Sequence, residues 1–320
     1  MTIGNLMRLL SDGEVHSGEQ LGEALGVSRA AVWKQLKKLE ALGVELVAVK
    51  GRGYRLAAPI ELLDEDTIRS ALGEVGARLN GLSVHERIDS TNAELARQGG
   101  PGMTACLAEY QSAGRGRARR PWASPFGANL YVSLAADVSS TRAPLGALSL
   151  AVGVCVIEAL RDIGAQDLAL KWPNDIWADG DKLGGILIEH RGELGARARL
   201  IVGLGLNVSM DRAQAESIDQ PWTRLIDHLP TPPGRNQLAA AVLEALIQAV
   251  DGFEQQGFET FRERWQAFDA VRDKPVRVIE SRGERVGIAR GIAADGALQV
   301  EFESGMQSVY SGDVSLRLAS

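Results

Sequence analysis

Gly114-Arg115-Gly116-Arg117-Ala118-Arg119-Arg120 is a basic stretch with four arginines and two glycines, between two apolar runs at residues 104–110 and 129–135. The two runs predict strands, so the stretch is expected to be a loop that joins them. Glycine lets backbone N–H groups approach a ligand closely, and guanidinium groups match phosphate oxygens in a bidentate way. These properties indicate a phosphate-binding loop, but a solvated basic turn or a nucleic-acid contact would have the same composition. The stretch is neither a P-loop, since no Gly-Lys-Ser/Thr follows, nor a dinucleotide fingerprint, since no helix is predicted after it.

On either side of this loop, strands and helices are mixed along the chain. Strands are also predicted at residues 84–88, 168–172, 185–189 and 200–208, and helices at residues 148–163, 236–253 and 258–268. This order predicts an α/β domain with one main, mixed sheet.

Three polar motifs lie at or beside the ends of these predicted strands. Lys171-Trp172-Pro173-Asn174-Asp175 follows one strand, which the proline stops, and Lys182-Leu183-Gly184-Gly185 leads into the next. Asp89-Ser90-Thr91-Asn92 precedes a helical pattern, and Gly203-Leu204-Gly205-Leu206-Asn207 ends another strand. Each motif also has a purely structural explanation: a hairpin with a polar turn, a helix N-cap, or small residues for strand packing. Together with the basic loop, they favour chemistry by positioning and charge around a nucleotide.

Residues 1–57 predict a winged helix-turn-helix. A first helix at residues 2–11 is followed by a helix that begins after Ser17 and ends at Gly26, and Ser28 can cap a third helix. A short turn between two such helices is typical of the motif, and apolar runs around Lys50-Gly51-Arg52-Gly53 predict a hairpin wing. The segment carries eight basic and six acidic residues, a net charge of +2, whereas the rest of the chain carries −8. A DNA-binding head is therefore expected, and a cap that only stabilises the remaining domains is the alternative.

The C-terminal part has a different pattern. Short apolar runs at residues 276–280, 285–294, 298–302 and 309–316 are separated by glycines. Such closely spaced strands predict a small β-barrel of about fifty residues. With Pro59 as the end of the head, the expected domains are residues 1–59, 60–271 and 272–320.

The composition excludes several classes of protein. No apolar run reaches the ~18 residues of a transmembrane helix, and the N-terminus lacks the basic start and cleavage site of a secretory signal. Cys106 and Cys155 are far apart, which fits a reducing cytosol and a role in packing. The four histidines are scattered and form no metal-binding spacing, and no Ser-His-Asp order supports a hydrolase.

In this order, the motifs resemble those of the bifunctional bacterial biotin–protein ligases, the biotin operon repressors. The resemblance covers essentially the whole chain, and its most specific part is Gly114-Arg115-Gly116-Arg117 with Lys171-Trp172-Pro173-Asn174-Asp175 downstream. It also includes Ser17-Gly18-Glu19-Gln20-Leu21-Gly22, Ser28-Arg29-Ala30-Ala31, Asp89-Ser90-Thr91-Asn92, Glu109-Tyr110-Gln111, Trp122, Ser124-Pro125-Phe126-Gly127-Ala128-Asn129-Leu130-Tyr131 and Lys182-Leu183-Gly184-Gly185-Ile186-Leu187. One departure is Ala118-Arg119-Arg120-Pro121, where the family often continues Arg-Gly-Arg, and it puts the role of Arg119 in doubt.

The resemblance implies a fold and an activity. The fold would be an α/β multidomain protein with a winged helix-turn-helix head, a central ligase domain with a mixed sheet, and an SH3-like C-terminal barrel. The enzyme would use ATP and Mg²⁺ to form biotinyl-5′-AMP, and would transfer biotin to a lysine of the biotin carboxyl carrier protein of acetyl-CoA carboxylase. The same chain would repress biotin synthesis genes as a ligand-promoted homodimer on operator DNA, with the adenylate as corepressor. Such a protein is expected in the cytoplasm, without a membrane partner.

The resemblance also assigns roles by position. Lys182, Arg117 and Asp175 would be catalytic, and Asp175 would also serve Mg²⁺. Biotin would contact Ser90, Thr91, Asn92, Gln111, Arg115, Gly116, Arg117 and Lys182. ATP or the adenylate would contact Arg117, Arg120, Trp122, Asn174, Asn207 and Trp222. DNA would contact Ser28, Arg29, Ala30, Trp33, Lys34, Lys50 and Arg52.

Three other functions compete with the bifunctional one. The chain could be a ligase whose head binds no operator, or a regulator that binds the ligand without transferring it. Intact Lys182, Arg117 and Asp175 argue against the regulator. A lipoate ligase is related by fold, but its motifs would differ from Gly-Arg-Gly-Arg and Lys-Trp-Pro-Asn-Asp.

Overall fold

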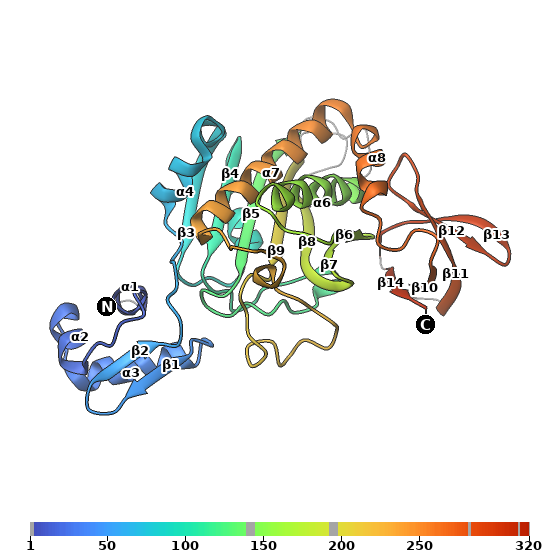
Figure 1. Ribbon diagram of the computed structural model, residues 1–320. Coiled ribbons are helices and arrows are strands. Elements are labelled where there is room, and N and C mark those ends of the chain that lie inside the picture. The colour runs from blue at the N-terminus through green and yellow to red at the C-terminus, as the bar shows by residue number, and fades with distance from the viewer. Residues whose placement is uncertain (1–2, 139–144, 192–197, 281–282, 313, 320) are drawn as a thin grey trace.

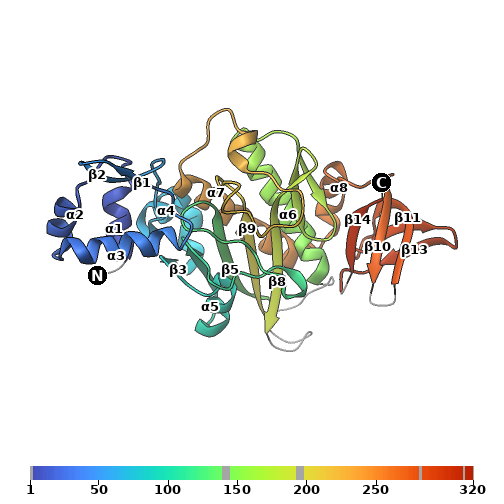
Figure 2. The same cartoon turned by 90° about the horizontal axis from the view of Figure 1, so that it is seen from below.

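The computed structural model describes residues 3–138, 145–191, 198–280, 283–312 and 314–319. Three units follow one another along the chain, and the N-terminal and C-terminal units lie at opposite ends of the central one (Figures 1 and 2). Within the described ranges, no helix is both long enough and apolar enough to cross a membrane.

The N-terminal unit is the predicted winged helix-turn-helix. Its elements are α1 (Ile3–Leu10), α2 (Gly18–Leu25), α3 (Arg29–Glu40), β1 (Leu46–Val49) and β2 (Gly53–Leu56). Ser17 and Gln20 form a reciprocal capping box at the start of α2, and Ser28 accepts a hydrogen bond from Ala31 N at the start of α3. Gly26 ends α2 with a φ of 65°, so the turn between the two helices needs a residue without a side chain.

The central unit is a seven-stranded mixed sheet in the order β3-β4-β5-β9-β8-β7-β6. Its strands are β3 (Leu79–His85), β4 (Met103–Ala108), β5 (Leu130–Val138), β6 (Leu168–Lys171), β7 (Asp175–Ala178), β8 (Asp181–Arg191) and β9 (Ala198–Leu206). Only β3 and β4 are parallel among the neighbouring strands. The helices α6 (Leu145–Asp162) and α7 (Arg235–Gln256), with α4 (Glu65–Leu72), form one layer, and α5 (Thr91–Gln98) packs against β4, β5 and β9 (Figures 1 and 2).

The C-terminal unit is a five-stranded antiparallel sheet in the order β13-β12-β11-β10-β14. The strands are β10 (Pro275–Glu280), β11 (Gly283–Ile292), β12 (Leu298–Phe302), β13 (Gly305–Val309) and β14 (Ser315–Leu318), and α8 (Glu259–Ala267) precedes them. Its buried side chains belong to the same hydrophobic cluster as those of the central unit. Trp172 donates a hydrogen bond from Nε1 to the carbonyl oxygen of Gly296 (3.1 Å), so the two units are joined by polar as well as apolar contacts.

The structure differs from the predicted elements at three places. Residues 309–316 were predicted as one strand, which is wrong: β13 ends at Val309 and β14 begins at Ser315, and Asp313 lies outside the described residues. The prediction missed β7, a four-residue strand that pairs with β6 in a hairpin closed by the cis Trp172–Pro173 bond. The strand predicted at residues 84–88 is β3, which begins earlier, at Leu79. The prediction missed its first residues because the polar Asn80 and Gly81 interrupt the apolar pattern. The motif around Pro173 is therefore both a hairpin turn and part of the candidate site.

Asp269 is partly buried where α8 leads into the C-terminal unit. Its Oδ1 accepts a hydrogen bond from Val271 N (3.0 Å), and its Oδ2 has no hydrogen-bond partner among the described residues. Burial is the main reason that the pKa of Asp269 is raised from 3.8 to about 6. The unfolded chain loses this proton at a lower pH than the folded chain does. The group therefore lowers stability progressively as the pH rises from about 4 to about 6.

We expect Asp269→Asn to remove this loss of stability. The free energy of unfolding of the variant, relative to the wild type, should increase by up to about 3 kcal/mol between pH 4 and pH 7. Urea denaturation at both pH values measures that change, and all other titrating groups are shared by the two proteins. The same difference between variant and wild type at both pH values would contradict the prediction.

Candidate active site and DNA-binding surface

A cavity of about 960 Å³ lies on the central sheet and extends to the C-terminal unit. All the ligand-binding residues that the sequence predicted line it: Ser90, Thr91, Asn92, Gln111, Arg115, Gly116, Arg117, Arg120, Trp122, Asn174, Asp175, Lys182, Asn207 and Trp222. They come from segments as much as 132 residues apart in the chain. A volume of this size is at the upper end of those that hold cofactor-sized ligands.

The polar end of the cavity lies at the N-terminus of α5. Thr91 donates from its backbone N to Gln111 Oε1 (2.9 Å), and Gln111 donates from Nε2 to Ser124 Oγ (3.2 Å). Ser133 Oγ lies 2.7 Å from Thr91 Oγ1 and 2.6 Å from Asn92 Oδ1. These hydroxyl and amide groups fix one another, and they present both donors and acceptors in a largely buried environment.

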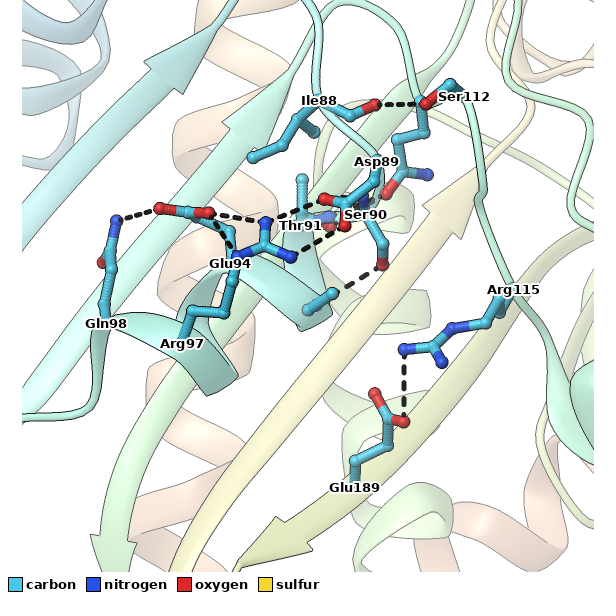
Figure 3. Close-up of polar contacts among 12 residues, drawn as sticks. Ile88, Asp89, Ser90, Thr91, Glu94, Arg97, Gln98, Ser112, Arg115 and Glu189 are labelled. Carbon is cyan, nitrogen blue, oxygen red and sulfur yellow. Dashed lines mark hydrogen bonds and ion pairs between the residues drawn. The ribbon is translucent and has the colours of Figure 1, made fainter.

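Three carboxylates that do not line the cavity support this end. Arg97 pairs with Asp89 (2.7 Å) and Glu94 (2.6 Å), and the ion pairs hold the segment before α5 against the helix (Figure 3). The hydrogen bond from Arg97 is the main reason that the pKa of Asp89 is lowered to about 2. Glu189 lies 3.6 Å from Arg115 and also accepts a hydrogen bond from Asn92 (2.8 Å), so it links the basic loop to the polar end.

A tryptophan covers the middle of the sheet. The ring of Trp122 lies on Gly185 of β8 and Gly205 of β9, where an added Cβ atom would be 3.1 Å and 2.5 Å from the ring, respectively. Because these two residues have no side chain, the Trp122 ring can lie against the sheet. The indole Nε1 is buried without a hydrogen-bond partner among the described residues.

Charged side chains gather at the other end. Lys182 Nζ lies 2.7 Å from Asp175 Oδ1 and 5.5 Å from the centre of the Trp122 ring, and both side chains of the ion pair are only 16% exposed. Arg117 donates to Asn174 Oδ1 (3.4 Å) and to the carbonyl oxygens of Ser311 and Gly312 in the C-terminal unit. The C-terminal unit thus helps to position the basic loop.

The basic loop has an unusual backbone at its departure from the family pattern. Ala118 and Arg119 both have a positive φ, 51° and 57°, which is uncommon for residues other than glycine. Arg120 follows in an extended conformation and lines the cavity, whereas Arg119 does not. The loop therefore directs three of its four arginines to the cavity.

Trp222 and Asn207 meet beside Lys182. The backbone of Lys182 pairs with the segment around Trp222, accepting from Thr223 N at 3.0 Å. Asn207 donates from Nδ2 to Lys182 O (3.4 Å). These contacts place a second tryptophan at the mouth of the charged end.

The sequence reasoning assigned no role to several residues at the cavity. Glu189, Ser124 and Ser133 hold the polar end, although Ser124 was within a stretch that carried the resemblance. Lys171 and Trp177 line the charged end, as do Val314, Ser315, Leu316, Arg317 and Leu318 of the C-terminal unit. No sequence signal pointed to the C-terminal strand, because a strand's spacing does not reveal which domain it packs against.

The residues present suit Mg²⁺ only as a metal shared with phosphate. Within the described ranges, no three His, Cys, Asp or Glu side chains gather as a metal cluster. Mg²⁺ in nucleotide sites is commonly held by one or two carboxylates and by substrate phosphates. The Asp175 carboxylate, with Asn174 Oδ1 beside it, meets that requirement.

The N-terminal unit exposes the residues that the sequence predicted to contact DNA. Arg29, Ala30, Trp33 and Lys34 are exposed at the start of α3, and Trp33 is 51% exposed. Lys50 and Arg52 are exposed in the turn between β1 and β2. Ser28 is the N-cap of α3, so its side chain holds the helix start. The geometry is that of a helix that can enter the major groove beside a basic wing.

Comparisons with known proteins agree with this organisation. The family model for a helix-turn-helix domain matches residues 5–55, the biotin/lipoate A/B protein ligase family matches residues 84–207, and the biotin protein ligase C-terminal domain matches residues 273–317. The bifunctional ligase/repressor BirA of Salmonella typhimurium is 43% identical over 316 residues, which are 98% of this chain and 97% of that protein. The protein of the same name from Escherichia coli is 41% identical over the same shares.

A solved structure and a shorter relative complete the comparison. The biotin protein ligase from Aquifex aeolicus in complex with biotin and ATP has a TM-score of 0.65 and 28% identity, and the match covers 75% of this chain and all of that one. The biotin–[acetyl-CoA-carboxylase] ligase of Mycobacterium tuberculosis is 32% identical over 79% of this chain and 95% of its own. The two relatives named above that match 98% of this chain are both bifunctional ligase/repressors. The chain belongs to the biotin protein ligase family, in its bifunctional ligase/repressor branch.

Proposed function

We propose that the chain activates biotin with ATP and transfers it to a lysine of the biotin carboxyl carrier protein of acetyl-CoA carboxylase. One observation carries this proposal: a single cavity joins a neutral polar end, at Thr91 and Gln111, to a strongly basic end, at Lys182 and Arg117. The polar end suits a ureido ring, which needs donors and acceptors. The basic end suits a carboxylate and a triphosphate.

The first step joins biotin to the nucleotide. An oxygen of the biotin carboxylate forms a bond to the α-phosphorus of ATP, the bond from that phosphorus to the bridging oxygen breaks, and pyrophosphate leaves with the electron pair. Lys182 neutralises the carboxylate and the α-phosphate, while Arg117 holds the phosphates. Fixed cations stabilise the negative charge that develops in such a transition state.

The second step transfers biotin to the carrier. The uncharged lysine amine of the carrier forms a bond to the carbonyl carbon of biotinyl-5′-AMP. The bond from that carbon to the phosphate oxygen breaks, AMP leaves with the electron pair, and the proton of the amine passes to water. We assign to Asp175, which lines the cavity beside Lys182, the role of orienting the incoming amine. When bound, Mg²⁺ neutralises phosphate charge beside Asp175.

The remaining residues bind the two halves of the adenylate. We assign Ser90, Thr91, Asn92, Gln111, Arg115, Gly116, Arg117 and Lys182 to biotin. We assign Arg117, Arg120, Trp122, Asn174, Asn207 and Trp222 to ATP and the adenylate. Trp222 would stack on the adenine from the mouth of the cavity.

Biotin-dependent exchange of labelled pyrophosphate into ATP tests the ligase proposal. We expect exchange with biotin and Mg·ATP but not with lipoate, followed by labelling of purified biotin carboxyl carrier protein. A carrier variant whose acceptor lysine is replaced is the matched control. Exchange with lipoate instead of biotin, or binding without exchange, would overturn the proposal.

We further propose that the head binds operator DNA of biotin synthesis genes, as a homodimer that biotinyl-5′-AMP promotes. The exposed residues Arg29, Trp33 and Lys34 on α3, with Lys50 and Arg52 on the wing, support this, and Ser28 and Ala30 complete the surface. A dimer would match two half-sites on the DNA. Residues 1–59, 60–271 and 272–320 would be the domains. The buried side chains of the head form a hydrophobic cluster apart from the main one, and Phe126 of the central unit joins it.

Titration of DNA from upstream of those genes, at one salt concentration, tests the repressor proposal. Binding should tighten markedly when biotin and Mg·ATP are both added. Equal and weak binding in both conditions, with the adenylate shown to be bound by mass spectrometry, would leave a ligase whose head does not bind this operator.

Lys34→Ala should weaken DNA binding without changing ligase activity. Lys34 is exposed near the start of α3, where it can reach a phosphate. Loss of one phosphate contact should reduce the slope of log K against log salt by about 1. Binding at several salt concentrations measures the slope, with Lys274→Ala in the C-terminal unit as the control. An unchanged slope would exclude Lys34 from the phosphate contacts.

A further inference from the structure

Lys171 lies in the cavity without a role in the proposed chemistry. It is the last residue of β6, and its Nζ is 4.8 Å from the centre of the Trp177 ring on β7. Both side chains line the charged end of the cavity. A cation over an indole face is held in place while its charge stays available to a further partner.

The charges around Lys171 do not balance. Asp175 lies opposite Lys171 in the β6–β7 pair, but its Oδ1 already contacts Lys182 at 2.7 Å. Within the parts of the chain that the structure describes, no carboxylate lies within ion-pair distance of Lys171. Burial, and then repulsion by Lys182, Arg317 and Arg120, lower the pKa of Lys171, and only Asp175 opposes them. Lys171, Lys182, Arg120 and Arg317 all line the cavity, and Asp175, the carboxylate opposite Lys171, is already paired with Lys182.

Such an excess of positive charge in a partly buried place is unfavourable unless an anion binds there. The order of the strands gives the direction of that anion. The polar end lies at β4, β5 and α5, Lys182 lies on β8, and Lys171 lies on β6 at the edge of the sheet, two strands further on. A ligand whose head group lies at the polar end and whose reacting group lies at Lys182 would place its leaving group at Lys171.

We propose that Lys171, held over Trp177, binds the β- and γ-phosphates of ATP and stabilises pyrophosphate as it leaves. This inference rests on the ligase activity proposed above and assigns the leaving-group end of the same cavity. Lys171 donates hydrogen bonds to the pyrophosphate oxygens, which receive the electron pair of the broken bond, and no proton transfer is needed. Lys171 therefore acts in the adenylation step and has no part in the transfer step, because pyrophosphate has left by then.

Lys171→Met tests the assignment, since methionine keeps an unbranched apolar chain beside Trp177 but removes the charge. We expect kcat/KM for ATP in biotin-dependent pyrophosphate exchange to fall about 10²-fold. Transfer of biotin from chemically prepared biotinyl-5′-AMP to the carrier should proceed at the wild-type rate. Lys171→Arg keeps the charge and should recover most of the exchange activity.

Arg161→Met is the matched control. Arg161 also stacks on an aromatic ring, 5.6 Å from the centre of Phe268, but it is not among the residues that line the cavity. This variant should show wild-type rates in both steps. Calorimetric titration with inorganic pyrophosphate gives a readout without turnover, and Lys171→Met should bind it more weakly than the wild type and Lys171→Arg do.

The outcomes separate this inference from the proposed function. Wild-type protein without biotin-dependent exchange would refute the ligase proposal itself. If the wild type exchanges pyrophosphate, equal losses of Lys171→Met in both steps, or no loss in exchange, would overturn the role of Lys171. Should Lys171→Met not fold, equal pyrophosphate affinity of Lys171→Gln and the wild type would overturn it as well.

Discussion

Lys182→Ala should lower the rate of biotinyl-5′-AMP formation by about 10²–10³-fold. Lys182 is held in place by the protein's own side chains, because its Nζ contacts Asp175 Oδ1 at 2.7 Å and lies over the Trp122 ring. A cation in a fixed, largely desolvated position stabilises developing charge without reorganisation. Alanine removes that charge and leaves the Asp175 carboxylate to repel the phosphates. The lost cation and the unpaired carboxylate both lower the rate of adenylate formation.

Biotin-dependent pyrophosphate exchange measures this loss directly. Lys274→Ala is the control, since Lys274 donates only to a backbone carbonyl near the domain junction and is not among the residues that line the cavity. Circular dichroism would verify that the Lys182 variant is folded. Near-normal exchange in that variant would show that Lys182 does not stabilise the transition state of adenylation. Arg117 would then be the next cation to test.

The sequence predicted which side chains line the cavity better than it predicted which distant segments of the chain lie together there. Gly-Arg-Gly-Arg and Lys-Trp-Pro-Asn-Asp favoured a charged ligand, and all the ligand-binding residues that the family resemblance implied line one cavity. Winged helix-turn-helix signals were also local: Ser17 and Ser28 cap helices through hydrogen bonds to residues three positions away. Such short-range interactions can be inferred from spacing alone.

Contacts between distant segments could not be inferred in this way. β7 was missed because its four residues, Asp175–Ala178, are too few for an alternating pattern to stand out. Arg117 donates hydrogen bonds to the carbonyl oxygens of Ser311 and Gly312, almost two hundred residues further along the chain. Neither segment has a sequence pattern that predicts contact with the other. The role of Lys171 likewise depends on Trp177, Arg120 and Arg317 being neighbours, which only the folded chain brings about.

Arg235→Met should have the largest effect on stability. Arg235 Nη2 lies 2.8 Å from Glu109 Oε2, and the side chains are only 11% and 5% exposed. Glu109 Oε1 also accepts a hydrogen bond from Leu63 N (2.5 Å), and Arg235 donates to the carbonyl oxygen of Glu61 (2.6 Å). The pair thereby fixes the segment between the head and the central sheet to the start of α7.

Removing one partner of a buried ion pair leaves the other charge without compensation. We therefore expect Arg235→Met to lower the free energy of unfolding by about 3–5 kcal/mol. The double variant Arg235→Met/Glu109→Gln should recover much of that loss, because it removes the buried charge as well. Arg262→Met breaks an exposed pair with Glu259, so its loss should stay below about 1 kcal/mol.

Urea denaturation followed by circular dichroism compares the four proteins. A loss for Arg235→Met no larger than that for Arg262→Met would show that Glu109 regains water when its partner is absent, and would contradict the role of the ion pair. Glu109 lies two residues before Gln111, which holds the polar end of the cavity. A loss of several kcal/mol that the double variant reverses should therefore be accompanied by weaker biotin binding in the single variant. That combination would mean that one buried ion pair fixes both the attachment of the head and the position of Gln111.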